Sequence, residues 1–199
     1  AGAGAYTIPL ARVVRRVTVV EPSKMQILRL MRRAKRESLS NIRVINKRWE
    51  DVGYDELEEY DIVIAAYCFN MPDIKSALYK MLNVTKGVLF LVCLADHGFR
   101  DVYEIITGEF SSTLDYPEYV YIYNVLCQMG VYANVEIVTR EYLIPLDFQL
   151  EILRYNYDIT PEIEERIRKH LALTNRLVEK DGKLWVKRRY RDAVIWYQE

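Results

Sequence analysis

The chain of 199 residues has few cysteines, no net charge and no long apolar run. Its three cysteines, Cys68, Cys93 and Cys127, are widely spaced and form no CxxC pair. We therefore expect neither a disulfide framework nor a zinc site, and a reducing cytoplasm is the default location. Lys plus Arg and Asp plus Glu both total 28, which argues against a protein that coats nucleic acid through bulk charge. The longest apolar runs, Gly87–Ala95 and Ile62–Phe69, are far shorter than the roughly 20 residues of a membrane-spanning helix.

Hydrophobic residues are abundant, at 51% of the chain, and charged residues make up 28%. This composition supports a packed core and argues against disorder. The length suits one domain, which we expect to span residues 1–199. The chain begins AGAGAYTIPLA, without an initiator Met or the basic segment of a signal peptide. Tyrosine occurs 16 times and phenylalanine 5 times, which is an unusual excess of tyrosine.

Strand and helix patterns alternate through the first half of the chain. The predicted strands are Arg16–Glu21, Asn41–Asn46, Tyr60–Tyr67 and Gly87–Cys93. The predicted helices are Tyr6–Val14, Lys24–Glu37 and Pro72–Leu82. A polar loop is expected at Lys47–Glu59. This alternation predicts a doubly wound α/β sheet with right-handed crossovers.

The second half of the chain is less regular. The predicted helices are Pro117–Gly130, Phe148–Tyr155 and Pro161–Leu173. The predicted strands are Asn134–Tyr142, Leu184–Tyr190 and Asp192–Tyr197. These elements follow the α/β part without a low-complexity linker, so a separate second domain is not expected.

Two glycines and an acid suggest a binding site. Gly2 and Gly4 lie in a turn that enters a helix, and Glu21 ends the next predicted strand. Glycine lets the backbone approach a ligand closely, and an acid at a strand end can hydrogen-bond both hydroxyls of a ribose. Thr7 stands where the dinucleotide fingerprint needs a third glycine, and no Gly-Lys-Ser/Thr P-loop occurs. The pattern indicates a nucleoside-cofactor site; an ordinary strand–helix turn and a solvated acid are the alternative.

At these residues the chain resembles the class I S-adenosylmethionine-dependent methyltransferases. The family's first motif is an acid, any residue, then Gly-x-Gly-x-Gly, followed by a helix that often ends in PLA. Aligning on Pro9–Ala11 places Gly2 and Gly4 on the second and third motif glycines. Glu21, in VTVVEPS, is similar to the family's ribose-binding acid. The resemblance covers residues 1 to about 95, and it places a first strand and the first motif glycine upstream of Ala1.

The resemblance implies a Rossmann-like methyltransferase sheet, mostly parallel, with an antiparallel C-terminal strand. Residues 96–132 would then be an insertion on the substrate side that acts as a lid. The later patterns YNVLCQMGVYANV and RYRDAVIWY are similar to a group of small prokaryotic methyltransferase-like proteins. The resemblance therefore implies one methyltransferase-like domain over residues 1–199.

The resemblance also implies S-adenosyl-L-methionine as the cofactor. Its contacts would come from the glycine turn, the ribose acid, the loop beside the adenine and the exit of the fourth family strand. Arg48 stands where the family often has an Asp, so Trp49 and Glu50 are the candidates at the adenine edge. The full expected set is Ala1, Gly2, Ala3, Gly4, Glu21, Pro22, Met25, Trp49, Glu50, Ala65 and Ala66. No metal ligands are expected.

Candidates for catalysis follow the predicted strands. Tyr67 and Asn70 follow Tyr60–Tyr67, and His97 follows Gly87–Cys93. His97 could act as a base at neutral pH, with a solvated loop histidine as the alternative. A tyrosine face could line the substrate through its ring faces, or it could simply pack as core. This face consists of Tyr116, Tyr119 and Tyr123.

The resulting functional prediction is methyl transfer to a small-molecule acceptor in the cytoplasm. The alternatives are a non-catalytic binding protein with this fold and an RNA methyltransferase that uses a basic helix face. That face consists of Arg29, Arg32, Arg33 and Arg36. A nucleic-acid partner is disfavoured, because AYCFNMP replaces the Asn/Asp-Pro-Pro-Tyr/Phe motif of DNA base methylases. No membrane partner is expected, and the sequence leaves a homodimer open.

Overall fold

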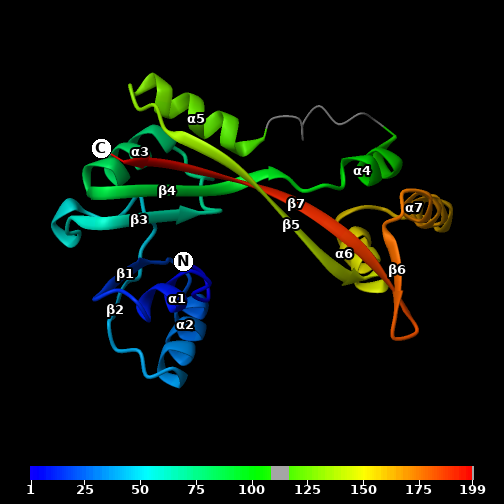
Figure 1. Ribbon diagram of the computed structural model, residues 1–199, viewed down its shortest axis with the longest axis horizontal. Helices are drawn as coiled ribbons and strands as arrows, with labels where there is room; N and C mark the ends of the chain where they lie inside the picture. Colours follow the sequence, from blue (N-terminus) through cyan, green and yellow to red (C-terminus); the bar gives the residue numbers. More distant parts are fainter. Residues whose placement is uncertain (109–116, 199) are drawn as a thin grey trace. The chain divides into compact units, whose positions relative to one another are not determined.

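The computed structural model describes residues 1–108 and 117–198. The chain divides into two compact units. Unit 1 contains Ala1–Phe90 and the last residues, Tyr197–Glu199, and unit 2 contains Leu91–Trp196. Figure 1 follows the chain from the blue N-terminus to the red C-terminus and labels its helices and strands. The expectation of a single domain over residues 1–199 stays a prediction.

The first part of unit 1 is a small α/β arrangement. β1 (Val17–Val20) and β2 (Ile42–Ile45) pair in parallel, with residues 17–20 opposite residues 42–45. α1 (Thr7–Ala11) precedes β1, and α2 (Lys24–Arg36) connects the two strands. Ser23 caps α2 by accepting a hydrogen bond from the third residue beyond it, as its position at the start of the helical pattern predicts.

A compact apolar cluster holds these elements together. Ile8 of α1 and Val19 of β1 pack with Leu30 and Ala34 of α2, and all four are buried. Leu30 and Ala34 lie four residues apart, so they share one face of the helix. Burial of this face, rather than helix propensity alone, fixes α2 against the strands.

The second part of unit 1 contains longer strands. β3 (Tyr60–Ala66) is followed by α3 (Ile74–Asn83) and then β4 (Thr85–Asp96), which continues into unit 2. A short 3-10 helix, η1 (Tyr54–Glu56), precedes β3 within the loop expected there. Asp73 caps α3 by accepting a hydrogen bond from the backbone N–H of a first-turn residue at 2.9 Å.

Unit 2 is built on long antiparallel strands. β5 (Asn134–Pro145) pairs along its length with β7 (Lys183–Gln198), residues 134–145 lying opposite residues 196–185. β6 (Leu177–Lys180) joins β7 through a tight turn. The turn residues Asp181 and Gly182 both have positive φ, at 53° and 67°, which suits the twist of a two-residue hairpin.

Four helices accompany these strands. They are α4 (Arg100–Thr107), α5 (Glu118–Gln128), α6 (Leu146–Asn156) and α7 (Pro161–Leu173). Figure 1 shows α4, α6 and α7 gathered around one end of β5 and β7. Their shared core consists of Phe99, Val102, Leu146, Leu150, Leu153, Ile167, Leu171 and Val186. Residues 96–132, expected as a lid, contain α4 and α5, while 109–116 lie outside the described residues.

The strands form two sheets among the residues that the structure describes. β1 and β2 make one, and the other has the order β3-β4-β7-β5, with β6 paired to β7. Among the described strands, β1 pairs with β2 alone and β3 with β4 alone, so each has one edge without a described partner. The α/β class and the antiparallel C-terminal strand are confirmed. The sheet differs from the expected continuous one in being divided between β1 and β3.

Three elements differ from the sequence prediction. β7 is one strand, whereas two strands separated at Arg191 were expected. The charged stretch stays in the strand because Asp192 is buried and ion-paired with Arg140 of β5. α4 and β6 were not predicted; α4 begins without a side-chain cap at Phe99, and β6 has only 4 residues. Within residues 1–108 and 117–198, no helix is long and apolar enough to cross a membrane.

Candidate functional site

The glycine turn before α1 has the backbone geometry expected of a ligand-approach site. Gly2 and Gly4 have φ of +58° and +89°, conformations that favour glycine. A Cβ on Gly4 would lie 2.5 Å from Leu30 Cδ1, so this glycine is required for packing against α2. A Cβ on Gly2 would meet nothing within 4 Å. Gly2 therefore presents backbone on an open side of the turn.

Glu21 lies directly after β1 and faces this turn. Its side chain is buried, with the residue 8% exposed. Oε2 accepts hydrogen bonds from the backbone nitrogens of Ala1 and Gly2 at 3.0 and 2.8 Å, and Oε1 accepts one from Ser23 N at 2.9 Å. Gly2 is thus hydrogen-bonded to this acid, while the prediction that the two glycines and Glu21 bind a cofactor stays a prediction.

Burial and hydrogen bonding act on the Glu21 carboxyl in opposite directions. Burial alone would raise its pKa, but the backbone hydrogen bonds from Gly2 and Ser23 act in the opposite direction, and the pKa is lowered. Glu21 is therefore a carboxylate at neutral pH. A carboxylate offers about four acceptor positions, and three are used here, so one position on Oε1 is left for a ligand hydroxyl.

Side chains from neighbouring elements hold the turn and the residues around Glu21. The Asn46 side-chain amide donates to the backbone oxygens of Glu21 and Pro22, at 2.8 and 3.0 Å. Arg33 of α2 donates to the Ala3 oxygen at 2.9 Å. Sequence reasoning did not single out Asn46, although its position at the end of a predicted strand was a signal.

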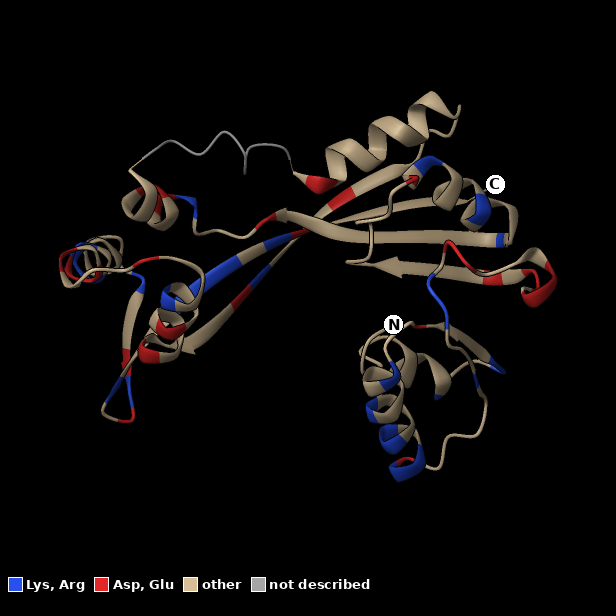
Figure 2. Ribbon diagram, turned by 180° about the vertical axis from the view of Figure 1, so that it is seen from behind, with Lys and Arg blue, Asp and Glu red and all other residues tan. Residues whose placement is uncertain are grey.

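One residue of the basic face of α2 forms a hydrogen bond within the fold. Figure 2 shows Lys and Arg residues along this helix. Arg33 is half-buried and bonded to the glycine turn, while Arg29, Arg32 and Arg36 are exposed. One member of the proposed RNA-binding face is therefore a structural support for the turn.

Trp49 and Glu50 belong to a loop that is fixed to α3. Trp49 Nε1 donates to the Ala77 oxygen at 3.1 Å, and the Lys80 ammonium donates to the backbone oxygens of Trp49, Glu50 and Val52. The ammonium also lies 5.2 Å from the Trp49 ring centroid. The loop is thus rigidly held, with Trp49 half-buried and Glu50 exposed.

The remaining predicted residues of unit 1 differ in exposure. Ala65 is buried in β3, and Ala66 ends that strand partly buried. Tyr67 follows with a positive φ of 52° and is 50% exposed; such backbone strain in a non-glycine residue is often found at functional sites. Met25 is 59% exposed, and Pro22 and Asn70 are exposed as well; their predicted roles stay predictions.

His97 lies in unit 2 and is half-buried. Its ring meets the Tyr103 ring edge-on, with centroids 5.1 Å apart. Nδ1 is buried and has no hydrogen-bond partner among the described residues. Burial lowers the pKa of His97, Arg188 and Arg100 lower it further, and Asp96 only partly opposes them. His97 is therefore not a freely solvated histidine, and its neutral form is favoured.

The tyrosine face proposed for the substrate is only partly described. Tyr119 and Tyr123 lie on α5 and are half-buried, whereas Tyr116 lies outside the described residues. The nearby Cys127 raises the pKa of Tyr123. Sequence reasoning missed a different aromatic group in this unit, around the buried Arg188 of β7.

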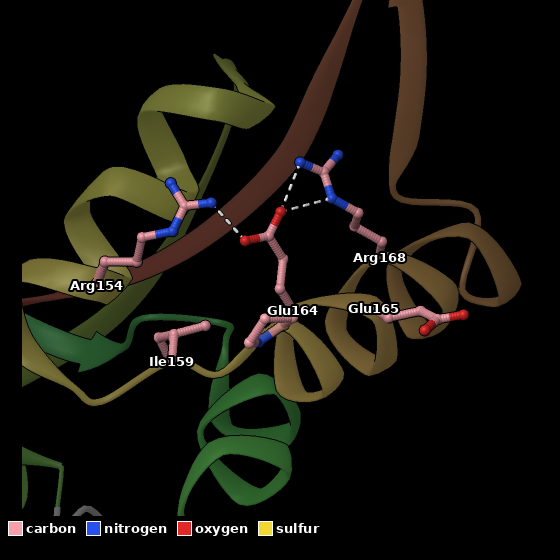
Figure 3. A pocket seen from close by; sticks show the side chains of 6 residues that line it. Arg154, Ile159, Glu164, Glu165 and Arg168 are labelled. Atoms are coloured by element: carbon pink, nitrogen blue, oxygen red, sulfur yellow. Dashed lines mark hydrogen bonds and ion pairs between the residues drawn. The ribbon is translucent and has the colours of Figure 1, made fainter.

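An open hollow of about 390 Å³ lies elsewhere in unit 2, at α6 and α7 (Figure 3). Glu164 points between Arg154 and Arg168 and is ion-paired with both. The hollow contains none of the predicted site residues, and its central carboxylate is already neutralised. Within the part of the chain that the structure describes, no group of three His, Cys, Asp or Glu side chains could hold a metal ion.

Known proteins resemble this chain in part of its sequence and in its fold. Residues 1–87 match the family model of a methyltransferase domain. A curated relative from Haemophilus influenzae, named an uncharacterized protein, is 26% identical over 142 residues, which cover 70% of this chain and 52% of the relative. The chain thus spans about half the length of that relative.

Solved structures share the fold at low sequence identity. A protein described as a candidate methyltransferase from Bacillus halodurans aligns with a TM-score of 0.63 and 14% identity, over 99% of this chain and 88% of its own. The YcgJ protein of Bacillus subtilis aligns with a TM-score of 0.57 and 15% identity, over 100% and 88%. The chain therefore shares the α/β fold of these two proteins. Over residues 1–87 the chain is similar to a methyltransferase domain.

Proposed function

We propose that this protein binds S-adenosylmethionine in unit 1 and transfers its methyl group to a small-molecule acceptor. The observation that carries the proposal is the pairing of an open glycine turn with a buried, ionised Glu21 after β1. This pairing lies within the residues that match a methyltransferase domain. It fits a nucleoside cofactor, because backbone can approach at Gly2 and a carboxylate acceptor lies beside it.

Different residues of unit 1 would bind the ribose and the adenine of the cofactor. Glu21 accepts a ribose hydroxyl at its free position on Oε1, and Gly2 allows close approach of the turn. Trp49, fixed by Lys80, offers a flat apolar surface for the adenine. The bound cofactor supplies a methyl group on an electrophilic sulfonium. The chain therefore needs chiefly to position the reactants and exclude water.

The acceptor would be positioned by residues that follow the strands. Tyr67, held at positive φ, and Asn70 present polar groups after β3. Within unit 2, His97 has its neutral form favoured and Nδ1 without a partner among the described residues, so it stays a separate candidate for a general base. Tyr119 and Tyr123 remain candidates for an aromatic wall. A protein that binds the cofactor without turnover is the alternative.

Calorimetric titration tests the cofactor site. S-adenosylmethionine and its demethylated product should bind the wild-type protein with micromolar dissociation constants. Glu21→Gln should weaken binding about tenfold or more, because it removes the charge and one acceptor position. The matched control is Glu59→Gln, which alters an exposed glutamate paired with Lys86 and should leave binding unchanged.

Folding of each variant would be checked by circular dichroism before titration. Failure of the folded wild-type protein to bind either compound would reject the proposed function. Equal binding by the wild type and Glu21→Gln would remove Glu21 from the site.

A further inference from the structure

Charge is unevenly distributed along this chain, although its net charge is zero. Residues 1–48 contain 12 Lys or Arg and only 2 Asp or Glu, whereas residues 49–199 contain 16 and 26. The first segment therefore carries a formal charge of +10, which the rest of the chain balances with −10. Such a separation of charge along a chain is typical of a protein with a polyanionic partner.

The exposed side of α2 carries the densest part of this positive charge. Figure 2 shows it as a run of Lys and Arg along the helix. We call its five exposed cationic side chains the outer face of α2; they are Lys24, Arg29, Arg32, Lys35 and Arg36. The opposite side packs Leu30 and Ala34, both 0% exposed, into the core of unit 1. The outer face is thus fixed on a packed helix and lies wholly within unit 1.

No negative side chain balances the outer face among the described residues. None of its five cations forms a salt bridge there. The two acids of residues 1–48 are both used elsewhere, because Glu21 is hydrogen-bonded to the glycine turn and Glu37 is paired with Arg12. The positive charge of the outer face is therefore available to an external polyanion.

Neighbouring cations repel one another on this face. Arg29 and Arg32 lie three residues apart, and Arg32 and Arg36 lie four apart, so their side chains are neighbours on the helix, where like charges are destabilising. The negative end of the helix dipole stabilises Lys35 and Arg36 in the last turn. That effect fades beyond the last turn, so it does not account for Arg29 and Arg32. A bound polyanion would remove the repulsion.

The spacing and chemistry of the outer face suit a row of phosphates. Arg29, Arg32 and Arg36 lie about 4.5 and 6 Å apart along the helix axis, and the phosphates of one duplex strand recur about every 3.4 Å. Each arginine can therefore reach a separate phosphate, which a guanidinium binds through two parallel N–H donors. α2 contains no aromatic residue on which a base could stack. These features favour contacts with the backbone of a duplex rather than with its bases.

An anionic membrane would also attract this charge, but the apolar residues of α2 do not suit it. Met25, Leu28 and Met31 are 59%, 51% and 40% exposed. They stand among the cations, whereas a helix that lies in a membrane inserts a continuous apolar face. The apolar face of α2, with Leu30 and Ala34, is already buried in unit 1. Nucleic acid is therefore the better match.

We propose that the outer face of α2 binds the sugar–phosphate backbone of duplex nucleic acid without sequence preference. The zero net charge of the chain argues against coating by bulk charge, but it does not bear on a local face. The missing Asn/Asp-Pro-Pro-Tyr/Phe motif concerns chemistry on a base, whereas backbone contacts need no such motif. The proposed binding does not rest on methyl transfer, because it needs no cofactor.

Fluorescence anisotropy with RNA and DNA duplexes of about 20 base pairs tests this proposal in the absence of cofactor. The wild-type protein should bind at about 0.1 M salt with a micromolar dissociation constant, and its affinity should fall steeply as salt rises. Combining Arg29→Gln, Arg32→Gln and Arg36→Gln should weaken binding about tenfold or more. The slope of log affinity against log salt should become shallower by about 3, one unit for each lost phosphate contact.

The matched control combines Arg166→Gln, Lys169→Gln and Lys183→Gln. It removes three exposed cations of unit 2 and should leave affinity and salt slope unchanged. Circular dichroism would check that both triple variants fold. Tighter binding of either the RNA or the DNA duplex supports the proposal and identifies the preferred nucleic acid.

Three results would overturn the proposal. They are no binding of either duplex by the wild type, equal weakening in the two triple variants, and tighter binding of polyglutamate or of phosphatidylserine vesicles than of the duplexes. The last result would identify an acidic protein or a membrane as the partner. The wild-type comparison decides even if the α2 variant does not fold. Cofactor titration of Glu21→Gln tests the proposed function separately.

Discussion

At the scale of single residues, the position of Glu21 was predictable from the sequence, but its hydrogen bonds were not. Its place after a β-branched strand and a glycine turn was enough to predict an acid beside the turn. The three backbone donors that hold its carboxylate were not predictable, because they depend on how the turn folds back over β1. These hydrogen bonds leave one acceptor position on the carboxylate, and the expectation that Glu21 binds a ribose stays a prediction.

For Arg188, by contrast, burial in the structure was not expected from the sequence. It stands among other basic residues, Lys187, Arg189 and Arg191, a composition that is more typical of an exposed surface than of a core. The alternation of a strand places Val186, Arg188 and Tyr190 on one face, and Val186 is buried. That period was the available signal, but the hydrogen-bond partners of Arg188 come from distant segments and could not be foreseen.

His97 yields a prediction about pH. Burial and the charges of Arg188 and Arg100 outweigh Asp96 and place its pKa below the ordinary value of 6.5. As the pH falls through 6.5, the unfolded chain takes up a proton before the folded protein does, so the free energy of unfolding decreases. His97→Gln should remove this part of the decrease. Urea unfolding between about pH 5 and pH 8 measures it.

Histidine NMR provides an independent check of the same shift. The His97 ring should titrate below 6.5 in the folded protein. A titration midpoint above 6.5, or an unchanged pH dependence of stability in His97→Gln, would show that burial does not control this residue.

At the scale of helices and strands, local signals determined which elements were predictable. α7 was predicted with its correct bounds because Thr160 and Pro161 mark its start. α4 begins at Phe99 without a side-chain cap, and its position depends on packing of Val102 in the unit 2 core. Long-range packing therefore explains why α4 was missed, whereas β6 was missed although its Asp181–Gly182 turn is a local hairpin signal.

The unpaired edge of β3 gives a prediction about association. Ile62 in this strand is 48% exposed, and open apolar edges promote pairing between molecules. Ile62→Lys should reduce self-association at high protein concentration, with little loss of stability. Analytical ultracentrifugation of both proteins measures the effect. The control is Tyr79→Lys, which places the same charge on exposed α3; equal effects of the two substitutions would contradict a role for the strand edge.

At the scale of the whole molecule, the α/β class was predictable because alternating patterns determine it. The division of the strands into two sheets was not predicted, since pairing depends on which edges meet. Among the described strands, β1 and β3 each have one edge without a described partner. The expectation of one methyltransferase-like domain over residues 1–199 stays a prediction.

The central claim is that unit 1 holds the methyl donor. Ultraviolet cross-linking of methyl-labelled S-adenosylmethionine, followed by peptide mapping, tests it most directly. The account predicts label within residues 1–66, competed by unlabelled S-adenosylhomocysteine and reduced in Glu21→Gln. Label confined to residues 91–196, or labelling that the competitor does not reduce, would contradict it.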